Sequence, residues 1–177
     1  FDAARAALER SLALRSAALP PTHRLLADSR HKLGVLEMSL GRPDLAAGHF
    51  GRAVEGLRAG GDSVELVATL GDLSAALIAD GQLAAAEQQL SDAMQRLPRL
   101  RPHEAAALRG DLLLREAELA QRLGDGQRAD AELARALALR RAAPAAHPLD
   151  LAATLAAAAD GHLAAGRYVE AMATQRE

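Results

Sequence analysis

The chain has 177 residues and no cysteine, and its 21 basic and 23 acidic side chains give a net charge of −2. A nucleic-acid-binding domain needs a basic face, so this balance argues against that class of protein. The lack of cysteine excludes disulfides, thiolate metal sites and cysteine nucleophiles. Charges interrupt every apolar stretch before the roughly 18 residues that a membrane-spanning helix needs, so we expect no membrane span.

The apolar half of the chain consists mainly of Ala and Leu. Only Phe1, Phe50 and Tyr168 are aromatic, and no run of β-branched residues occurs. Ala and Leu are the strongest helix formers, whereas a sandwich or a doubly wound sheet needs β-branched strands. The composition therefore predicts an all-α protein.

Residues 1–19, which open with FDAARAALERS, are predicted to be a helix from the start. The sequence has no initiator Met and no signal peptide, so we expect a fragment of a longer protein. A chain without cysteine is compatible with the cytosol and with the periplasm. We expect the cytoplasm and leave the periplasm open.

Residues 22–60 are predicted to form two helices joined by a turn. The first covers 22–40 and ends at Gly41, because glycine tolerates the left-handed conformation that is common at helix C-termini. The second lies in the stretch GRPDLAAGHFGRA, where Pro43 suits an early helical position.

Three further units follow the same plan, and residues 1–19 match the second helix of a truncated one. The units cover residues 62–98, 102–143 and 147–177, the last of them truncated. Their first helices are expected at 63–80, 102–123 and 148–165, and their turn glycines are Gly81, Gly124 and Gly166. Asp62 and Glu65 are interpreted as a helix cap and its reciprocal partner.

The units share a pattern after each turn glycine: a small residue, then a large apolar residue, then Ala. The first small residues are Ala46, Ala86, Ala129 and Ala171, with Ala4 in the opening helix. The large residues are Phe50, Leu90, Leu133 and Leu8, and the last small residues are Ala53, Ala93, Ala136 and Ser11. Successive copies lie 42, 40, 43 and 42 residues apart, a period that indicates a repeat architecture. Helices pack closely only where small residues lie at the crossing, so we expect these positions at helix contacts.

This pattern resembles the tetratricopeptide repeat (TPR), a helix–turn–helix unit with small residues at its eighth, twentieth and twenty-seventh positions and a large apolar residue at the twenty-fourth. With the turn glycine at the fifteenth position, Gly34 falls on the eighth and Pro98 on the thirty-second, where the family often has proline. The period near 42 is similar to that of kinesin light chains and many bacterial multi-repeat proteins, and residues 136–171 are the most family-like stretch. The resemblance implies a right-handed α-solenoid of antiparallel helix pairs, with about nine helices in one domain over residues 1–177.

Three residues depart from the family pattern. Glu116 falls on a seventh position, where an apolar residue is expected. Arg30 and His162 fall where Leu or an aromatic residue is usual. The third repeat therefore has the least well-defined register.

No motif for catalysis, for a cofactor or for a metal is present in the sequence. It has no phosphate-binding loop, no glycine-rich dinucleotide turn and no HExxH. No two of its six histidines share metal-ligand spacing on one helix, and we expect His162 to be a packing residue. We therefore expect neither an enzyme nor a cofactor- or metal-binding protein.

One charged stripe lies on the first helix of the third repeat, at spacings of four, three and four: Asp111, Arg115, Glu118 and Arg122. It can be an intrahelical ion-pair ladder on a solvated face. In tetratricopeptide solenoids the first helices line a concave groove, and the resemblance places these four residues at groove positions, so both interpretations can hold together. Equivalent groove positions elsewhere carry Asp28, His31, Lys32, Val35, Asp72, Ala75 and Asp160.

The resemblance implies a protein-interaction module that binds a peptide or helical segment of a partner in this groove, within a larger bacterial protein. The alternatives are a peptide-sensing regulatory domain of a kinase or transcription regulator, and a structural spacer or oligomerisation unit. Some members hold a C-terminal carboxylate with a clamp of Lys, Arg and Asn, which this chain lacks because it has one lysine and no asparagine. Each repeat buries its apolar face against a neighbour, so the truncated ends predict end-to-end self-association or frayed helices.

Overall fold

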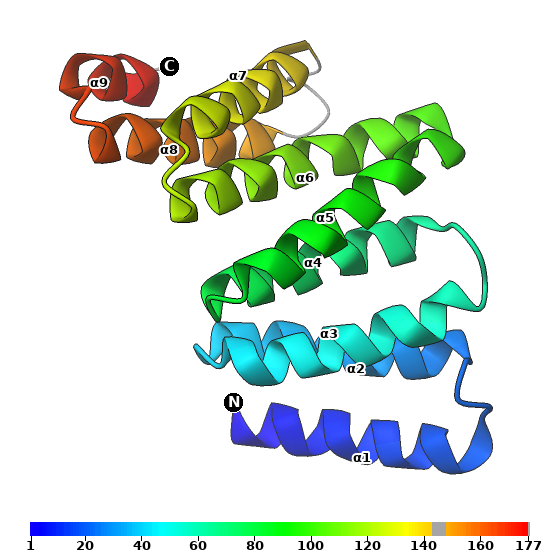
Figure 1. Cartoon of the computed structure of the whole chain (residues 1–177). Coiled ribbons are helices and arrows are strands. Elements are labelled where there is room, and N and C mark those ends of the chain that lie inside the picture. The colour runs from blue at the N-terminus through cyan, green and yellow to red at the C-terminus, as the bar shows by residue number, and fades with distance from the viewer. Residues whose placement is uncertain (143–147, 177) are drawn as a thin grey trace. The chain divides into compact units, whose positions relative to one another are not determined.

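The computed structural model describes residues 1–142 and 148–176, apart from the side chains of residues 148, 149, 164, 175 and 176. The described residues form nine α-helices and one short 3-10 helix, with no strand among them, which confirms the all-α prediction (Figure 1). Within this part of the chain, no helix combines the length and the apolar character needed to cross a membrane. The chain divides into two compact units, Phe1–Ala105 and Ala106–Glu177.

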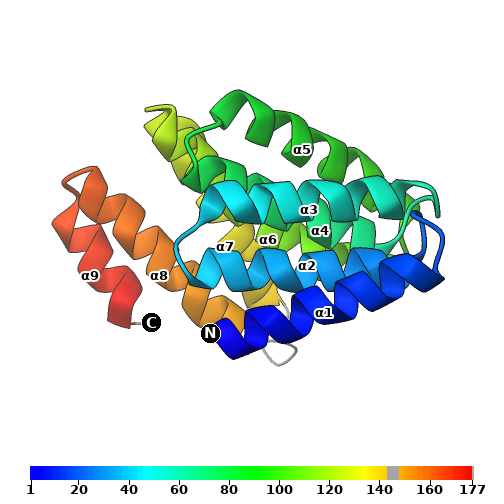
Figure 2. The ribbon, with the colours of Figure 1, turned by 90° about the horizontal axis from the view of Figure 1, so that it is seen from below.

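The first unit holds two complete helical hairpins and the opening helix. Figures 1 and 2 show the first helices of its hairpins, α2 and α4, on one side of the unit and the second helices, α3 and α5, on the other. Its elements are α1 (Asp2–Ala18), α2 (Arg24–Ser39), α3 (Pro43–Arg58), α4 (Val64–Ala79), α5 (Leu83–Arg96), the 3-10 helix η1 (Leu97–Arg99) and the start of α6 (Pro102–Arg122).

The second unit contains the rest of α6, followed by α7 (Gly126–Ala142), α8 (Pro148–Ala164) and α9 (Tyr168–Arg176). The predicted first helices agree with α2, α4, α6 and α8 to within two residues at each end. The predicted junction between the third and fourth repeats, at residues 143–147, lies outside the described residues.

The turns between paired helices are made by the predicted glycines. Gly41, Gly81, Gly124 and Gly166 have φ between 69° and 82°, a left-handed conformation that a side chain disfavours. The predicted cap at Asp62 is wrong. The Ser63 hydroxyl accepts the Leu66 N–H at 3.2 Å and caps α4, whereas the Asp62 carboxylate is held by the guanidinium groups of Arg96 and Arg99, at the far end of the same hairpin.

The repeated small and large residues form the core. The fully buried small residues are Ala46, Ala53, Ala86, Ala93, Ala129, Ala136 and Ala171, and Phe50, Leu90 and Leu133 are buried beside them. The eighth positions are buried too, at Gly34, Ser74, Ala117 and Ala159. The predicted register therefore holds in all four repeats, the third included. In α1, which no helix precedes in this chain, Ala4 is exposed and Leu8 and Ser11 are half-buried.

Two of the three residues that depart from the family pattern have a hydrogen-bond partner. Arg30 turns its guanidinium to the backbone carbonyl of Arg52, at 3.2 Å. The His162 ring accepts a hydrogen bond from Arg167 Nε at 3.1 Å, as expected for a packing residue. Glu116 is half-buried, and burial raises the pKa of its carboxyl above the usual value.

Repeat one packs Phe50 where repeats two and three have Leu90 and Leu133. A Cβ atom placed on Gly34 would lie 2.6 Å from the Phe50 ring, which is too close for any side chain. Glycine at this position therefore makes the room that the larger ring needs.

Candidate functional site

Six of the predicted groove positions lie in the first unit, on α2 and α4. Residues 41 positions apart meet here, because His31 Nε2 lies 2.8 Å from Asp72 Oδ2. The His31 ring also contacts the buried Phe50 ring, at 5.3 Å between centroids. This polar bridge joins α2 to α4 and rests on the core of repeat one.

Lys32 and Val35 lie on the same helix as His31. Lys32 Nζ donates to Asp28 Oδ2 at 3.0 Å, and Arg15 of α1 donates to the same oxygen at 3.2 Å. Burial alone would raise the pKa of Asp28, but these two hydrogen bonds outweigh it and the pKa lies below its usual value. Val35 is 46% exposed, so this face of α2 offers an apolar contact beside the charges.

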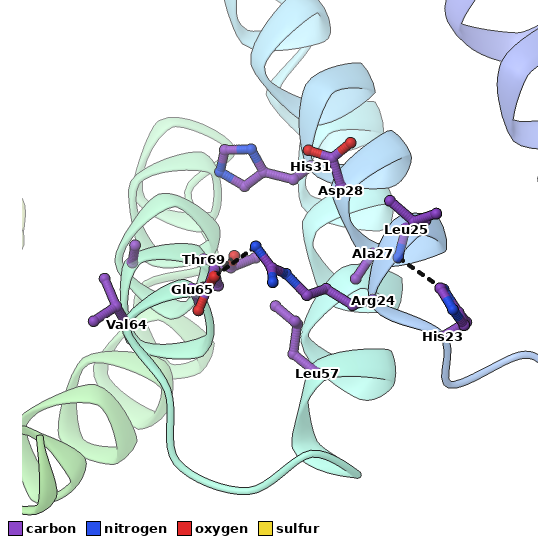
Figure 3. Close-up of a pocket in the computed structure, with 11 residues that line it drawn as sticks. His23, Arg24, Leu25, Ala27, Asp28, His31, Leu57, Val64, Glu65 and Thr69 are labelled. Carbon is purple, nitrogen blue, oxygen red and sulfur yellow. Dashed lines mark hydrogen bonds and ion pairs between the residues drawn. The ribbon is translucent and has the colours of Figure 1, made fainter.

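A cavity of about 660 Å³ opens between the N-terminal halves of α2 and α4 (Figure 3). This α2/α4 cavity has apolar walls formed by Ala27, Leu57, Val64 and Ala68. Its polar lining comes mainly from Arg24, Asp28, His31, Glu65 and Thr69. The volume falls within the roughly 300–1,000 Å³ typical of ligand sites.

Two bridges between α2 and α4 bound the cavity. Arg24 and Glu65 form an ion pair at 3.1 Å where the two helices begin, as Figure 3 shows. The His31–Asp72 bridge lies seven residues further along both helices, which is roughly 10 Å of helix. Between the bridges, Asp28 of α2 binds Lys32 and Arg15, and the Thr69 hydroxyl of α4 donates to the Glu65 carbonyl of its own helix, so neither side chain spans the gap between α2 and α4. The cavity fills this gap.

Sequence analysis named Asp28 and His31 but missed the rest of the cavity. Arg24 is the first residue of α2, and Glu65 was interpreted as a capping partner. Leu57 comes from the end of α3, a second helix, and groove positions were sought only on first helices. One available signal was the small Ala68 at the repeat position that holds Asp28 one repeat earlier.

The charged stripe of the third repeat lies on α6 in the second unit. Its residues do not form a continuous ladder: in the described part of the chain only Arg115 and Glu118 lie within ion-pair distance, at 3.5 Å. Arg122 is exposed, as is Asp160 on α8, and no described side chain pairs with either. Asp111 turns away from the stripe and binds Arg140 of α7.

Arg140 explains why the ladder is broken. Its side chain is 7% exposed, and its guanidinium packs against Gly110 and donates to Asp111 and, at 2.9 Å, to Asp150 of α8. A buried charge needs close counter-charges much more than an exposed one does, so Arg140 outcompetes Arg115 for Asp111. The three charged groups tie α6, α7 and α8 together.

The described residues hold no candidate metal site. None of their His, Asp and Glu side chains gather in a group of three that could hold a metal ion. The arrangement around the α2/α4 cavity can bury an incoming side chain and pair with its charge.

Comparison with known proteins identifies the fold. No family model matches the chain, and no curated protein matches its sequence. The nearly identical TPR-like repeats of a Podosopora anserina putative kinesin light chain match with a TM-score of 0.68, and a point variant of the same repeats matches with 0.71. Both are 21% identical to this chain over 96% of its length, and it covers 81% and 80% of theirs.

A third solved structure is BtubC (BKLC) from P. vanneervenii, with a TM-score of 0.69 and 25% identity. The match covers 96% of this chain and 66% of BtubC. Identities this low establish similarity of fold alone. The chain therefore has the tetratricopeptide-repeat fold in the form found in kinesin light chain-like proteins.

Proposed function

We propose that the chain is a protein-interaction module that holds a segment of a partner protein against the α2 and α4 face. The observation that carries the proposal is the α2/α4 cavity, a partly apolar recess lined by charged side chains. Helical repeat proteins commonly bind partners on the surfaces that their stacked first helices form. The exposed Val35 and the charged pairs beside it extend the contact surface along α2.

The proposal includes a setting for the module. It is a non-catalytic part of a larger bacterial protein in the cytoplasm, and its four repeats form one continuous scaffold over residues 1–177. In the second unit, Asp111, Arg115, Glu118, Arg122 and Asp160 provide a further charged surface for the same partner. End-to-end association through the terminal helices is a separate property that does not use either surface.

A capture experiment with matched variants tests the proposal. The bait is the whole chain, and bound proteins from a lysate of the source organism are identified by mass spectrometry. Val35→Glu adds a charge to the α2 face, whereas Leu45→Glu adds the same charge to α3, on the other side of the unit, at a residue that is equally exposed (46% and 47%). A partner lost with Val35→Glu and retained with Leu45→Glu supports the proposal.

The double variant Arg115→Glu, Arg122→Glu reports on the second unit in the same experiment. Loss of the partner from this variant alone moves the site to α6. Equal recovery with every variant contradicts binding on the first helices, and self-association with no captured partner favours a spacer or oligomerisation unit. A partner whose binding compacts the chain in small-angle scattering favours a peptide-sensing regulatory domain.

A further inference from the structure

Asp28 lies where the α2/α4 cavity meets the contact between α1 and α2. It lines the cavity, and its Oδ2 atom accepts hydrogen bonds from Lys32 Nζ at 3.0 Å and from Arg15 Nη1 at 3.2 Å. Figure 3 shows its carboxylate pointing away from the Arg24 guanidinium. In this orientation Asp28 leaves the space between the two bridges open.

Arg15 of α1 is bound to α2 at three points. Besides Asp28, its Nη1 atom donates to the Leu25 carbonyl oxygen at 2.9 Å and to the Ser29 hydroxyl at 2.7 Å. Ser29 is buried, and the three acceptors lie within about one turn of α2. Arg15 is not among the residues that line the cavity, yet it holds two that do, Leu25 and Asp28.

Asp28 has two possible partners on its own helix. Lys32 lies four residues after it and Arg24 four residues before it, and this spacing brings either charge within reach of the carboxylate. In the structure Asp28 binds Lys32, and Arg24 binds Glu65 of α4 at 3.1 Å. Arg15 binds the same oxygen as Lys32, so its attraction favours this arrangement over a pair with Arg24. An Asp28–Arg24 pair would instead place both side chains in the cavity.

We propose that Arg15 is a positioning residue of the binding site, which keeps the α2/α4 cavity open by holding Asp28 away from Arg24. The helix α1 lines no part of the cavity, but through this one side chain it belongs to the site. The inference rests on the proposed function, since it assigns a residue that controls access to the same cavity.

The pKa of the Asp28 carboxyl, measured by ¹³C NMR during a pH titration, tests the arrangement without any partner. In the unaltered chain Asp28 does not pair with Arg24, so Arg24→Gln should change this pKa little. In an Arg15→Gln chain Asp28 pairs with Arg24, so adding Arg24→Gln should raise the pKa by about 0.3 more, the effect of losing an ion pair at a spacing of four residues. An equal effect of Arg24→Gln in both chains overturns the inference.

Arg10→Gln is the matched control for this measurement. Arg10 lies on α1 and is exposed, so its replacement removes the same charge from the same helix. Arg24→Gln should change the pKa of Asp28 as little in an Arg10→Gln chain as in the unaltered one. A larger effect in both arginine variants would show a general loss of positive charge on α1, and it overturns a specific role of Arg15.

Peptide binding separates this inference from the proposed function. Peptides that are selected from a random phage library and lost with Val35→Glu support binding on the α2 face. They should bind the Arg15→Gln chain at least about twofold more weakly, since a cavity closed half of the time halves the competent fraction. Their affinity for the Arg10→Gln chain should be unchanged.

The possible failures of this experiment are distinguishable. Equal affinity for the Arg15→Gln chain and the unaltered chain overturns the role of Arg15 while the proposed function stands. If the selection yields no peptide that Val35→Glu removes, the proposed function loses support, and the pKa of Asp28 still decides whether Arg15 holds this carboxylate away from Arg24.

Discussion

The contact between Gly34 and Phe50 makes Gly34→Ala the most informative stability variant. The added Cβ would lie 2.6, 2.7 and 2.8 Å from three carbon atoms of the Phe50 ring. Non-bonded carbon atoms favour about 3.5–4.0 Å, so the ring must move by about 1 Å. Phe50 is only 1% exposed, so its ring cannot move without displacing its neighbours in the core.

The size of the effect follows from two opposing contributions. Overpacking a filled core costs about 1–3 kcal/mol. Replacing a helical glycine by alanine gains about 0.5–1 kcal/mol, because alanine restricts the unfolded chain. We therefore expect Gly34→Ala to lower the free energy of unfolding by up to about 2.5 kcal/mol.

A matched variant isolates the overpacking. Gly48→Ala lies in α3, where no atom comes within 4 Å of the added Cβ, so it carries only the helix gain and should stabilise the protein. Urea unfolding followed by far-ultraviolet circular dichroism measures both variants. The double variant Gly34→Ala, Phe50→Leu should be more stable than the sum of its single effects predicts. If Gly34→Ala stabilises the chain as much as Gly48→Ala, the close approach of Gly34 to Phe50 is refuted.

Three further variants test other parts of the core by the same unfolding measurement. Ala86→Leu enlarges a fully buried helix contact and should cost about 1–3 kcal/mol; an unchanged midpoint contradicts the repeat register. Arg140→Leu should be neutral or stabilising, because Asp111 and Asp150 are 61% and 42% exposed and water can solvate them; a loss of several kcal/mol contradicts this. Glu116→Gln should raise the midpoint at neutral pH, because burial first, and the nearby Glu132 carboxylate next, raise the folded-state pKa of Glu116. The charged form of such a group is less favourable in the folded chain, so the gain should fade as the pH falls from the raised folded-state pKa to the unfolded-state pKa; a gain that persists in acid contradicts this.

The fold was predictable because its determinants are local and repeated. A glycine turn, a small residue five positions later and a large apolar residue four after that specify a helical hairpin without knowledge of distant contacts. The pattern tolerates single exceptions. Glu116 places a charged residue at a core position, yet the third repeat stays in register, with Ala117 buried beside it.

The candidate site was only partly predictable. A cavity forms where side chains of neighbouring helices do not contact each other, and the sequence does not show which side chains those are. Arg24 and Glu65 lie 41 residues apart, and nothing local shows that they bridge α2 to α4. Arg140 was also missed, because basic residues are common in the last turn of a helix and its sequence context gives no sign that it is buried. A clue was its repeat position, which Leu57 and Leu97 occupy in the first two repeats and which is therefore part of the core.

The Gly34–Phe50 contact also sets limits on how such a protein can gain or lose repeats. The two residues belong to the same hairpin, one on α2 and one on α3. A gene rearrangement that joins two copies within the loop between hairpins keeps them together. One that joins copies at the glycine turn combines Phe50 with Ser74 or Ala117 from another repeat, and the ring then meets a Cβ. The hairpin, and not the single helix, is thus the smallest segment of this chain that duplication can move intact.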